Sequence, residues 1–214
     1  MRILITAGGT REYIDPVRFI SNASSGRMGY ALARAALKAG HEVTLITAPT
    51  ALKPAAGVKV VPVESAAEMF EAVKAEFSRC ECLIMAAAVS DYTPARPSKT
   101  KLKKQTSKLT LELKPTQDIL QWAGKHKAAS RNLGRRPQIV VGFALEDRDL
   151  WANAERKLRE KNLDMIVANA PAAIGAEVST LYIKSVDSDW LEIANAGKAT
   201  SAKQIIDGIE RLAR

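Results

Sequence analysis

Short apolar segments alternate with amphipathic segments through the first 87 residues, and this alternation constrains the fold more than any other feature. The first segment, Arg2–Ala7, reads RILITA and stops at two glycines, as a buried parallel strand does. The expected elements are strands at Arg2–Ala7, His41–Thr47, Val58–Val63 and Cys82–Ala87 and helices at Ser25–Ala39 and Ala66–Ser78. This order predicts an α/β fold with a doubly wound, Rossmann-like parallel sheet, in which ligands bind at the carboxyl ends of the strands.

A basic segment interrupts this pattern in the middle of the chain. From Tyr92 to Leu111 there are six lysines and arginines and no acidic residue, and the stretch Lys108–Leu113 (KLTLEL) alternates like a half-exposed strand. We therefore expect a basic arm or hairpin around residues 92–113 that leaves the sheet. After it we expect helices at Asp118–Lys127, Asp149–Lys161 and Ser201–Leu212, strands at Gln138–Phe143 and Asp164–Ala168, and a small hairpin from Leu181–Lys184 and Trp190–Ile193.

The length and composition predict one globular unit. A chain of 214 residues, 47% of them hydrophobic, can bury a core of its own. No apolar run approaches the roughly 18 residues of a membrane span, and Met1 and Arg2 lead directly into the first strand, so we expect a cytoplasmic protein with no membrane partner. Cys80 and Cys82 are too close together for an ordinary disulfide and too few for a zinc site.

The glycines after the first strand do not match the commonest nucleotide-binding motifs. Gly8 and Gly9 are followed by about 15 residues before the expected helix, and the second strand ends at Thr47 without a carboxylate for a ribose. A P-loop motif is also absent from the sequence. These observations argue against an NAD-dependent oxidoreductase and a P-loop enzyme. The net charge of +9 fits either a nucleic-acid partner or phosphorylated substrates.

Polar residues at the start of the first expected helix suggest an anion site. A helix N-terminus carries unpaired N–H groups and the positive end of the helix dipole, so Ser24, Ser25 and Gly26 could hold a phosphate. Asn22 adds an amide that can bind a carboxylate or a carbonyl oxygen. Spacing alone leaves a structural alternative open, in which Ser24 only caps the helix and Gly26 only permits close packing.

Six segments of the chain resemble phosphopantothenoylcysteine synthetases, the synthetase half of the bacterial two-function coenzyme A biosynthesis protein. They occur in the family's order over nearly the whole chain, and the first one, ITAGGTREYIDPVRFISNASSGRMG, is highly specific. The segments are Ile5–Gly29, Ala86–Tyr92 (AAAVSDY), Lys101–Lys104 (KLKK), Pro115–Leu120 (PTQDIL), Val141–Glu146 (VGFALE) and Lys157–Asn169 (KLREKNLDMIVAN).

This resemblance implies a ligase that joins 4'-phosphopantothenate to L-cysteine. The substrate carboxylate would attack the α-phosphate of CTP to give an acyl-cytidylate and pyrophosphate, and the cysteine amine would then displace CMP. It also implies Mg²⁺ bound with CTP, and a single synthetase domain over residues 1–214 with no flavin and no flavin-dependent decarboxylase domain. An ATP-using version of the same ligase and a non-catalytic relative that binds nucleotide or nucleic acid remain alternatives.

The resemblance also assigns residues to the site. Asn22 would hold the reacting carboxyl group, and Lys101, on a flap over the site, would act in converting the acyl-cytidylate. Residues expected to bind substrate are Arg18, Asn22, Ser24, Ser25, Gly26, Met28 and Ala87. Residues expected to bind nucleotide are Gly8, Gly9, Ser24, Ala88, Asp91, Lys101, Phe143, Ala144, Lys157 and Lys161.

Three of these assignments leave alternatives open. Arg18 would contact the phosphate of the substrate or tie down its own loop. Asp91 would recognise the cytosine or act as a metal ligand. Lys157 and Lys161 lie one helical turn apart and would bind the triphosphate, although the same spacing occurs on an exposed basic helix.

The expected partners are small molecules and a second copy of the chain. Family members are dimers whose interface includes the strand-like part of the arm, and an unpaired KLTLEL edge would otherwise favour aggregation. We expect no nucleic-acid partner, because Tyr92 is the only aromatic residue near the basic run and single-strand binders interleave aromatic with basic residues.

Overall fold

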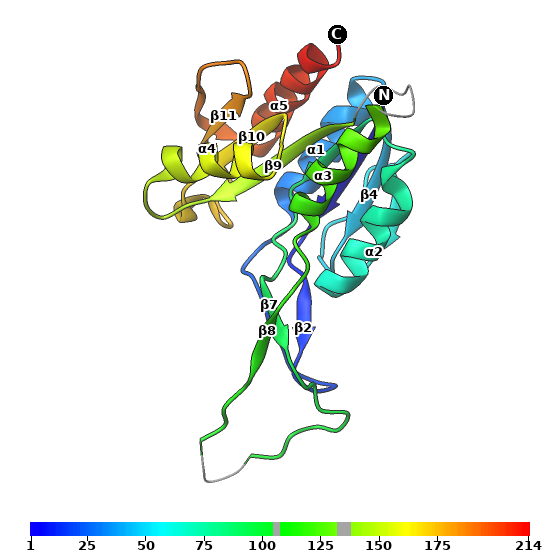
Figure 1. The fold of residues 1–214 in the computed structure, drawn as a ribbon, viewed down its shortest axis with the longest axis vertical. Helices are drawn as coiled ribbons and strands as arrows, with labels where there is room; N and C mark the ends of the chain where they lie inside the picture. Colours follow the sequence, from blue (N-terminus) through cyan, green and yellow to red (C-terminus); the bar gives the residue numbers. More distant parts are fainter. Residues whose placement is uncertain (105–107, 132–137) are drawn as a thin grey trace.

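The computed structural model of the protein describes residues 1–104, 108–131 and 138–214 (Figure 1). It contains an eight-stranded sheet in the order β12-β11-β10-β9-β6-β1-β4-β5. The strands are β1 Arg2–Ala7, β4 Glu42–Thr47, β5 Lys59–Pro62, β6 Cys82–Met85, β9 Ile139–Leu145, β10 Met165–Asn169, β11 Val178–Ser185 and β12 Leu191–Gly197. The six strands from β5 to β10 are parallel, which confirms the predicted α/β fold.

Helices cover both faces of this sheet (Figure 1). The helices are α1 Arg27–Lys38, α2 Ala66–Phe77, α3 Ile119–Arg131, α4 Leu150–Glu160 and α5 Lys198–Leu212, with a short 3-10 helix, η1, at Pro171–Ala173. One buried cluster packs α1 and α5 against the sheet, and a second packs α2, α3 and α4 against the other face. No helix that the structure describes is both long and apolar enough to cross a membrane.

The strand sequences explain this double coverage. In β1, Ile3 and Ile5 belong to the first buried cluster and Leu4 to the second, so successive side chains enter opposite cores. Both faces are therefore buried, and a strand such as RILITA needs no polar alternation.

The terminal hairpin is larger than the sequence indicated. β11 pairs antiparallel with β12, which confirms the expected hairpin, but its strands are longer than expected and β11 also pairs antiparallel with β10, so the hairpin extends the sheet. Joining the exposed edge of β10 gives the backbone of β11 partners on both sides, which favours longer strands. Helix α5 consequently begins at Lys198, three positions before the expected Ser201.

Two short hairpins project from the sheet (Figure 1). The first joins β2 Arg11–Tyr13 to β3 Phe19–Ser21 and was not expected from the sequence. The second joins β7 Tyr92–Pro94 to β8 Leu113–Pro115 and confirms the expected excursion. The two hairpins touch through β2 and β7. Residues 105–107, within the expected arm, lie outside the described part of the chain.

The predicted strand at Lys108–Leu113 is wrong apart from its last residue. Backbone pairing in the arm stops at the hydrogen bond from Ala95 N to Glu112 O, 2.9 Å long, and residues 108–112 form no strand. Pro94 and Pro97 lack N–H groups, which removes donors from the opposite side of the hairpin. Leu109 is 66% exposed, so the alternation of KLTLEL does not reflect a buried face.

Candidate active site

A cavity of about 680 Å³ lies at the carboxyl ends of the central strands, where the doubly wound fold predicts a ligand. Its walls come from the ends of β6, β9 and β10, the first turns of α1 and α5, and the side of α4. The predicted residues that line it are Asn22, Ser24, Ser25, Gly26, Met28, Ala87, Ala88, Asp91, Phe143, Lys157 and Lys161. The predicted residues that do not line it are Gly8, Gly9, Arg18, Lys101 and Ala144.

The first turn of α1 has no side chain of its own as a cap. Gly26 is the N-cap, with a φ of 73° that favours glycine, and neither a capping side chain nor an acidic residue occurs in this turn. Ser24 Oγ accepts a hydrogen bond from Gly26 N at 3.3 Å, so Ser24 is not the N-cap. Ser25 Oγ similarly accepts from Arg27 N at 3.5 Å. The next N–H groups of the turn, those of Met28 and Gly29, have no intrahelical acceptor and can bind an anion in the cavity.

Close packing brings this helix start to the end of β1. A Cβ atom built on Gly29 would lie 2.5 Å from Ala7 Cβ and 3.0 Å from Thr6 O, so the helix approaches the strand as closely as a glycine allows. The same approach places Gly26 against Gly8, whose Cα would be 3.4 Å from an added Cβ. Gly8 therefore packs against the start of α1 and does not line the cavity.

Asn22 links two segments that line the cavity, its own and the one that contains Ala88 and Val89. Its Nδ2 donates hydrogen bonds to Val89 O at 3.0 Å and to Ala88 O at 3.4 Å. Gly9 packs behind it, since an added Cβ would lie 2.7 Å from Asn22 O. Among the described residues, Asn22 Oδ1 has no recorded hydrogen-bond partner, so the amide is positioned and keeps one polar atom for a ligand.

Two lysines, Lys157 and Lys161, also line the cavity. Lys157 on α4 donates from Nζ to Phe143 O at 3.3 Å, and burial followed by the charge of Lys161 lowers its pKa. Lys161 forms an ion pair with Asp118 at 2.7 Å. Burial raises the pKa of Asp118, but its bonds to Lys161 and to Gln121 N outweigh burial, and its pKa is lowered. Lys157 is therefore a partly buried cation in the cavity, unlike a lysine on an exposed basic helix.

Two carboxylates reach the cavity, from Asp91 and Asp118. Asp118 is held by Lys161, whereas no ion pair is recorded for Asp91 in the described part of the chain. Over these same residues the structure contains no group of three or more side chains suited to hold a metal ion. Asp91 and Asp118 are the carboxylates that the cavity could offer to Mg²⁺, a cation that keeps several waters and usually binds only one or two protein carboxylates.

Arg18 lies outside the cavity, where the loop between β2 and β3 meets the basic arm. Its Nε donates to Asp15 Oδ2 at 3.0 Å, and its Nη2 donates to Leu102 O. Leu102 N also donates to Asp15 Oδ2, at 3.1 Å. The hydrogen bond from Arg18 holds the pKa of Asp15 far below its usual range despite burial. In this structure Arg18 ties its loop to the arm, and its contact with substrate stays a prediction.

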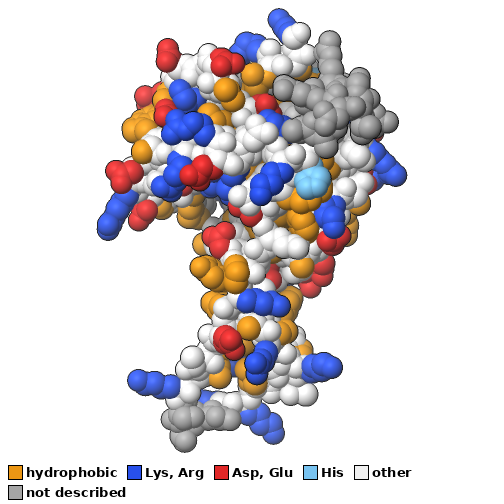
Figure 2. Space-filling view, in the orientation of Figure 1, with side chains coloured by type: hydrophobic (Ala, Val, Ile, Leu, Met, Phe, Trp, Pro, Cys, Tyr) orange, Lys and Arg blue, Asp and Glu red, His pale blue; other side chains and the backbone are white. Residues whose placement is uncertain are grey.

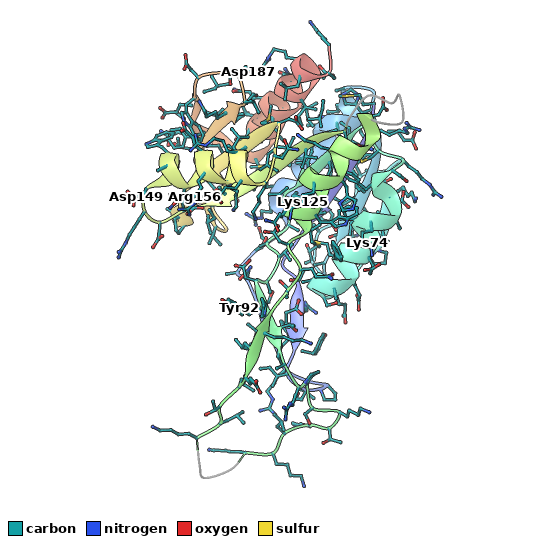
Figure 3. The ribbon with its side chains drawn as sticks, in the orientation of Figure 1. Lys74, Tyr92, Lys125, Asp149, Arg156 and Asp187 are labelled. Carbon is teal, nitrogen blue, oxygen red and sulfur yellow. The ribbon has the colours of Figure 1, made fainter. Side chains whose placement is uncertain are left out.

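Lys101 lies next to this junction on the arm and is exposed. The arm extends away from the sheet, with Tyr92 near its upper end (Figure 3). Lys101 is therefore not brought to the cavity of its own chain in this structure, and its catalytic role stays a prediction.

Sequence reasoning missed the wall formed by the last part of the chain. This wall includes Leu181 of β11, the segment 173–175 and Lys198 at the start of α5. Arg27, at the start of α1, was also missed, although it lies inside the most specific motif. Its basic side chain next to a glycine-rich helix start was the only available signal.

Comparisons with known proteins cover nearly the whole chain. The model of the family described as DNA/pantothenate metabolism flavoprotein C-terminal domain matches residues 1–212. The chain is 42% identical over 217 residues to the coenzyme A biosynthesis bifunctional protein CoaBC of Bacillus subtilis (strain 168), covering 99% of this chain and 52% of that protein. It is 45% identical over 207 residues to a cysteine/cysteine sulfinic acid decarboxylase of an unknown prokaryotic organism, covering 94% and 56%.

A solved structure is similar over the same length. The crystal structure of the C-terminal domain of the coenzyme A biosynthesis bifunctional protein CoaBC has a TM-score of 0.83 and 40% identity, covering 99% of this chain and 95% of that one. The chain thus spans about half the length of the curated relatives it matches, and nearly all of this separate domain.

Proposed function

The chain belongs to the family of the DNA/pantothenate metabolism flavoprotein C-terminal domain, and we propose that residues 1–214 act as one domain, a phosphopantothenate–cysteine ligase. The observation that carries this proposal is the cavity that joins Asn22, the start of α1 and Lys157. An activated carboxyl group, its phosphate and a triphosphate need these three kinds of contact. No step of the proposed reaction uses a flavin.

In the first step, the carboxylate of 4'-phosphopantothenate attacks the α-phosphorus of CTP. A bond forms between the carboxylate oxygen and phosphorus, the bond to the β-phosphate bridge breaks, and pyrophosphate leaves with its electron pair. Asn22 orients the carboxyl group, the N–H groups of α1 stabilise the developing negative charge, and Lys157 and Lys161 neutralise phosphate oxygens. The carboxylate and the triphosphate are both anions and repel each other in solution, so these contacts are needed to bring them together.

In the second step, the amine of L-cysteine attacks the acyl carbon. The bond from this carbon to the phosphate oxygen breaks, CMP leaves, and the nitrogen loses a proton to complete the amide. Mg²⁺ would be held by the phosphates with Asp91 or Asp118, and it would supply charge neutralisation at the phosphates when bound. The choice of CTP follows from the resemblance to the bacterial enzymes, and the cytoplasmic location from the hydropathy of the sequence; both stay predictions.

The proposed function is tested by measuring pyrophosphate release with 4'-phosphopantothenate and Mg²⁺. CTP and ATP are compared, each with and without L-cysteine. We expect release that needs phosphopantothenate and prefers CTP, with CMP and the amide product appearing only when cysteine is added. A preference for ATP would support the ligase activity but assign ATP as its nucleotide. No pyrophosphate release with either nucleotide would contradict the proposal.

A Lys101→Gln variant should separate the two steps. We expect it to release pyrophosphate and to accumulate the acyl-cytidylate, because the proposed role of Lys101 lies in the conversion of that intermediate. Rapid quenching followed by mass spectrometry measures the intermediate. Lys108→Gln, on the same arm, is the matched control, and a native rate of amide formation by the Lys101 variant would remove Lys101 from the mechanism.

The arm also supports a proposed homodimer. Hydrophobic side chains cover its upper part and lysines and arginines its far end (Figure 2). Tyr92 is 56% exposed, Leu113 42% and Leu111 37%, so large apolar side chains of the arm face water. A second copy that pairs with the arm would cover these side chains and its unpaired backbone.

A Leu113→Glu substitution should shift the protein from dimer to monomer, because it places a charge on the proposed apolar interface. Sedimentation velocity over a range of concentrations measures the change. Leu212 is similarly exposed, at 40%, on α5, so Leu212→Glu is the matched control. A native protein that sediments as a monomer at all concentrations would contradict the dimer.

A further inference from the structure

Two cations at one end of the cavity have no role in the reaction described above. Arg27 is the first residue of α1 and Lys198 is the first residue of α5, and both line the cavity. The two helices pack side by side on one face of the sheet (Figure 1). Their first turns therefore bring two positive side chains to the same wall.

The described part of the chain gives neither cation a negative partner. In residues 1–104, 108–131 and 138–214, no ion pair is recorded for Arg27 or Lys198. Lys198 Nζ donates instead to the neutral Ser179 Oγ at 2.8 Å, and Ser179 is only 9% exposed. Burial and then the charge of Arg27 lower the pKa of Lys198, so the two cations are close enough to repel each other. By contrast, Lys161 in the same cavity has Asp118 as its partner.

The two helix starts increase this positive potential. Neither first turn contains an acidic residue, and neither N-cap, Gly26 or Gly197, supplies a side-chain hydrogen bond. Cations are unfavourable at a helix N-terminus, because the helix dipole already places positive charge there. Two cationic side chains and two helix starts thus concentrate positive charge at one wall of the cavity. An anion bound in the cavity would compensate this charge.

We propose that Arg27 and Lys198 form a subsite for a diphosphate group, the β- and γ-phosphates of the nucleotide and the pyrophosphate they become. This inference rests on the proposed function. Arg27 directly follows Ser24–Gly26, where the reacting phosphate is proposed to lie, so the leaving group would extend from α1 toward α5. A diphosphate carries several charges over two phosphorus atoms, and it matches cations on two separate helices better than a single phosphate does.

The test is direct binding of magnesium pyrophosphate, measured by calorimetry on the full chain. Arg27→Gln and Lys198→Gln are each expected to weaken binding by about tenfold or more, the usual loss when a charged hydrogen-bond donor is removed. Glutamine at position 198 keeps a donor for Ser179. The matched controls are Arg34→Gln on α1 and Lys203→Gln on α5, since neither residue lines the cavity. Both controls should bind pyrophosphate with native affinity.

Binding of inorganic phosphate and 4'-phosphopantothenate separates the possible anions. The proposal expects their affinities to change less than twofold in both variants. Weaker phosphopantothenate binding with unchanged pyrophosphate binding would assign the subsite to the substrate phosphate and overturn the proposal. Native pyrophosphate affinity in both variants, or no pyrophosphate binding by the native protein, would also overturn it.

This readout is independent of turnover. A native protein that makes no acyl-nucleotide but binds pyrophosphate through Arg27 and Lys198 would contradict the ligase and keep the subsite. Thermal melting of each variant beside its control identifies any loss of folding. Because Arg27 is exposed, Arg27→Gln is expected to disturb the fold less than Lys198→Gln.

Discussion

An Asn22→Asp variant should release pyrophosphate at least about a hundredfold more slowly than the native protein, a loss typical of a removed stabilising donor. The native amide donates to Val89 O and Ala88 O, and a carboxylate has no hydrogen to donate to either. The new charge would also face the incoming carboxylate of phosphopantothenate. The measurement is pyrophosphate release with phosphopantothenate and CTP in the absence of cysteine, which isolates the first step.

The control for this variant adds the same charge elsewhere. Asn195 is an exposed residue of β12 with a φ of 45°, and it does not line the cavity. Asn195→Asp should therefore keep the native rate. CTP binding by the Asn22 variant should stay within a few-fold of native, since the proposed role concerns the carboxyl group. A native rate of release by Asn22→Asp would exclude that role.

Gly29→Ala should destabilise the protein and disturb the anion site together. The added Cβ would lie 2.5 Å from Ala7 Cβ, so α1 has to move away from β1. Overpacking of this kind costs about 1–3 kcal/mol in the free energy of unfolding. Because the same helix start carries Ser24–Arg27, its displacement should also weaken magnesium pyrophosphate binding. Urea unfolding and calorimetry measure the two effects.

Gly197→Ala provides the comparison for this substitution. Gly197 has a φ of −68°, and nothing lies within 4 Å of an added Cβ. We expect its effect on the free energy of unfolding to remain below about 1 kcal/mol, the range for a change at a helix N-cap. If Gly29→Ala unfolds at the same urea concentration as the native protein, the close approach of α1 to β1 does not limit stability.

The central sheet was predictable because its strands are buried on both faces. Segments such as Arg2–Ala7 and Cys82–Met85 are continuous apolar runs, and helices with one apolar face separate them. The cavity position followed from this topology, since parallel strands place their carboxyl ends at one edge. Asn22 and Ser24–Gly26 could be predicted to line the cavity, because polar residues at a helix start can bind an anion.

Other features depend on contacts between distant parts of the chain. β2 and β3 have three residues each, too few for a recognisable period, and they are stabilised by pairing with each other and by contact with the arm. The pairing of β11 with β10 reflects an available sheet edge, which no local pattern encodes. Arg27 and Lys198 are 171 positions apart, and only the packing of α1 against α5 brings them to one wall.

The order of the strands along the chain also affects how the protein folds during synthesis. Domains gain structure from the N-terminus during synthesis, so β1, β4, β5 and β6 can assemble while α5 is still within the ribosome. The cavity wall that contains Lys198 forms only after β11 and β12 have joined the sheet. A nascent chain would therefore lack a complete anion site until α5 has been made. A polyphosphate bound between α1 and α5 would then stabilise this late segment against a helix made much earlier.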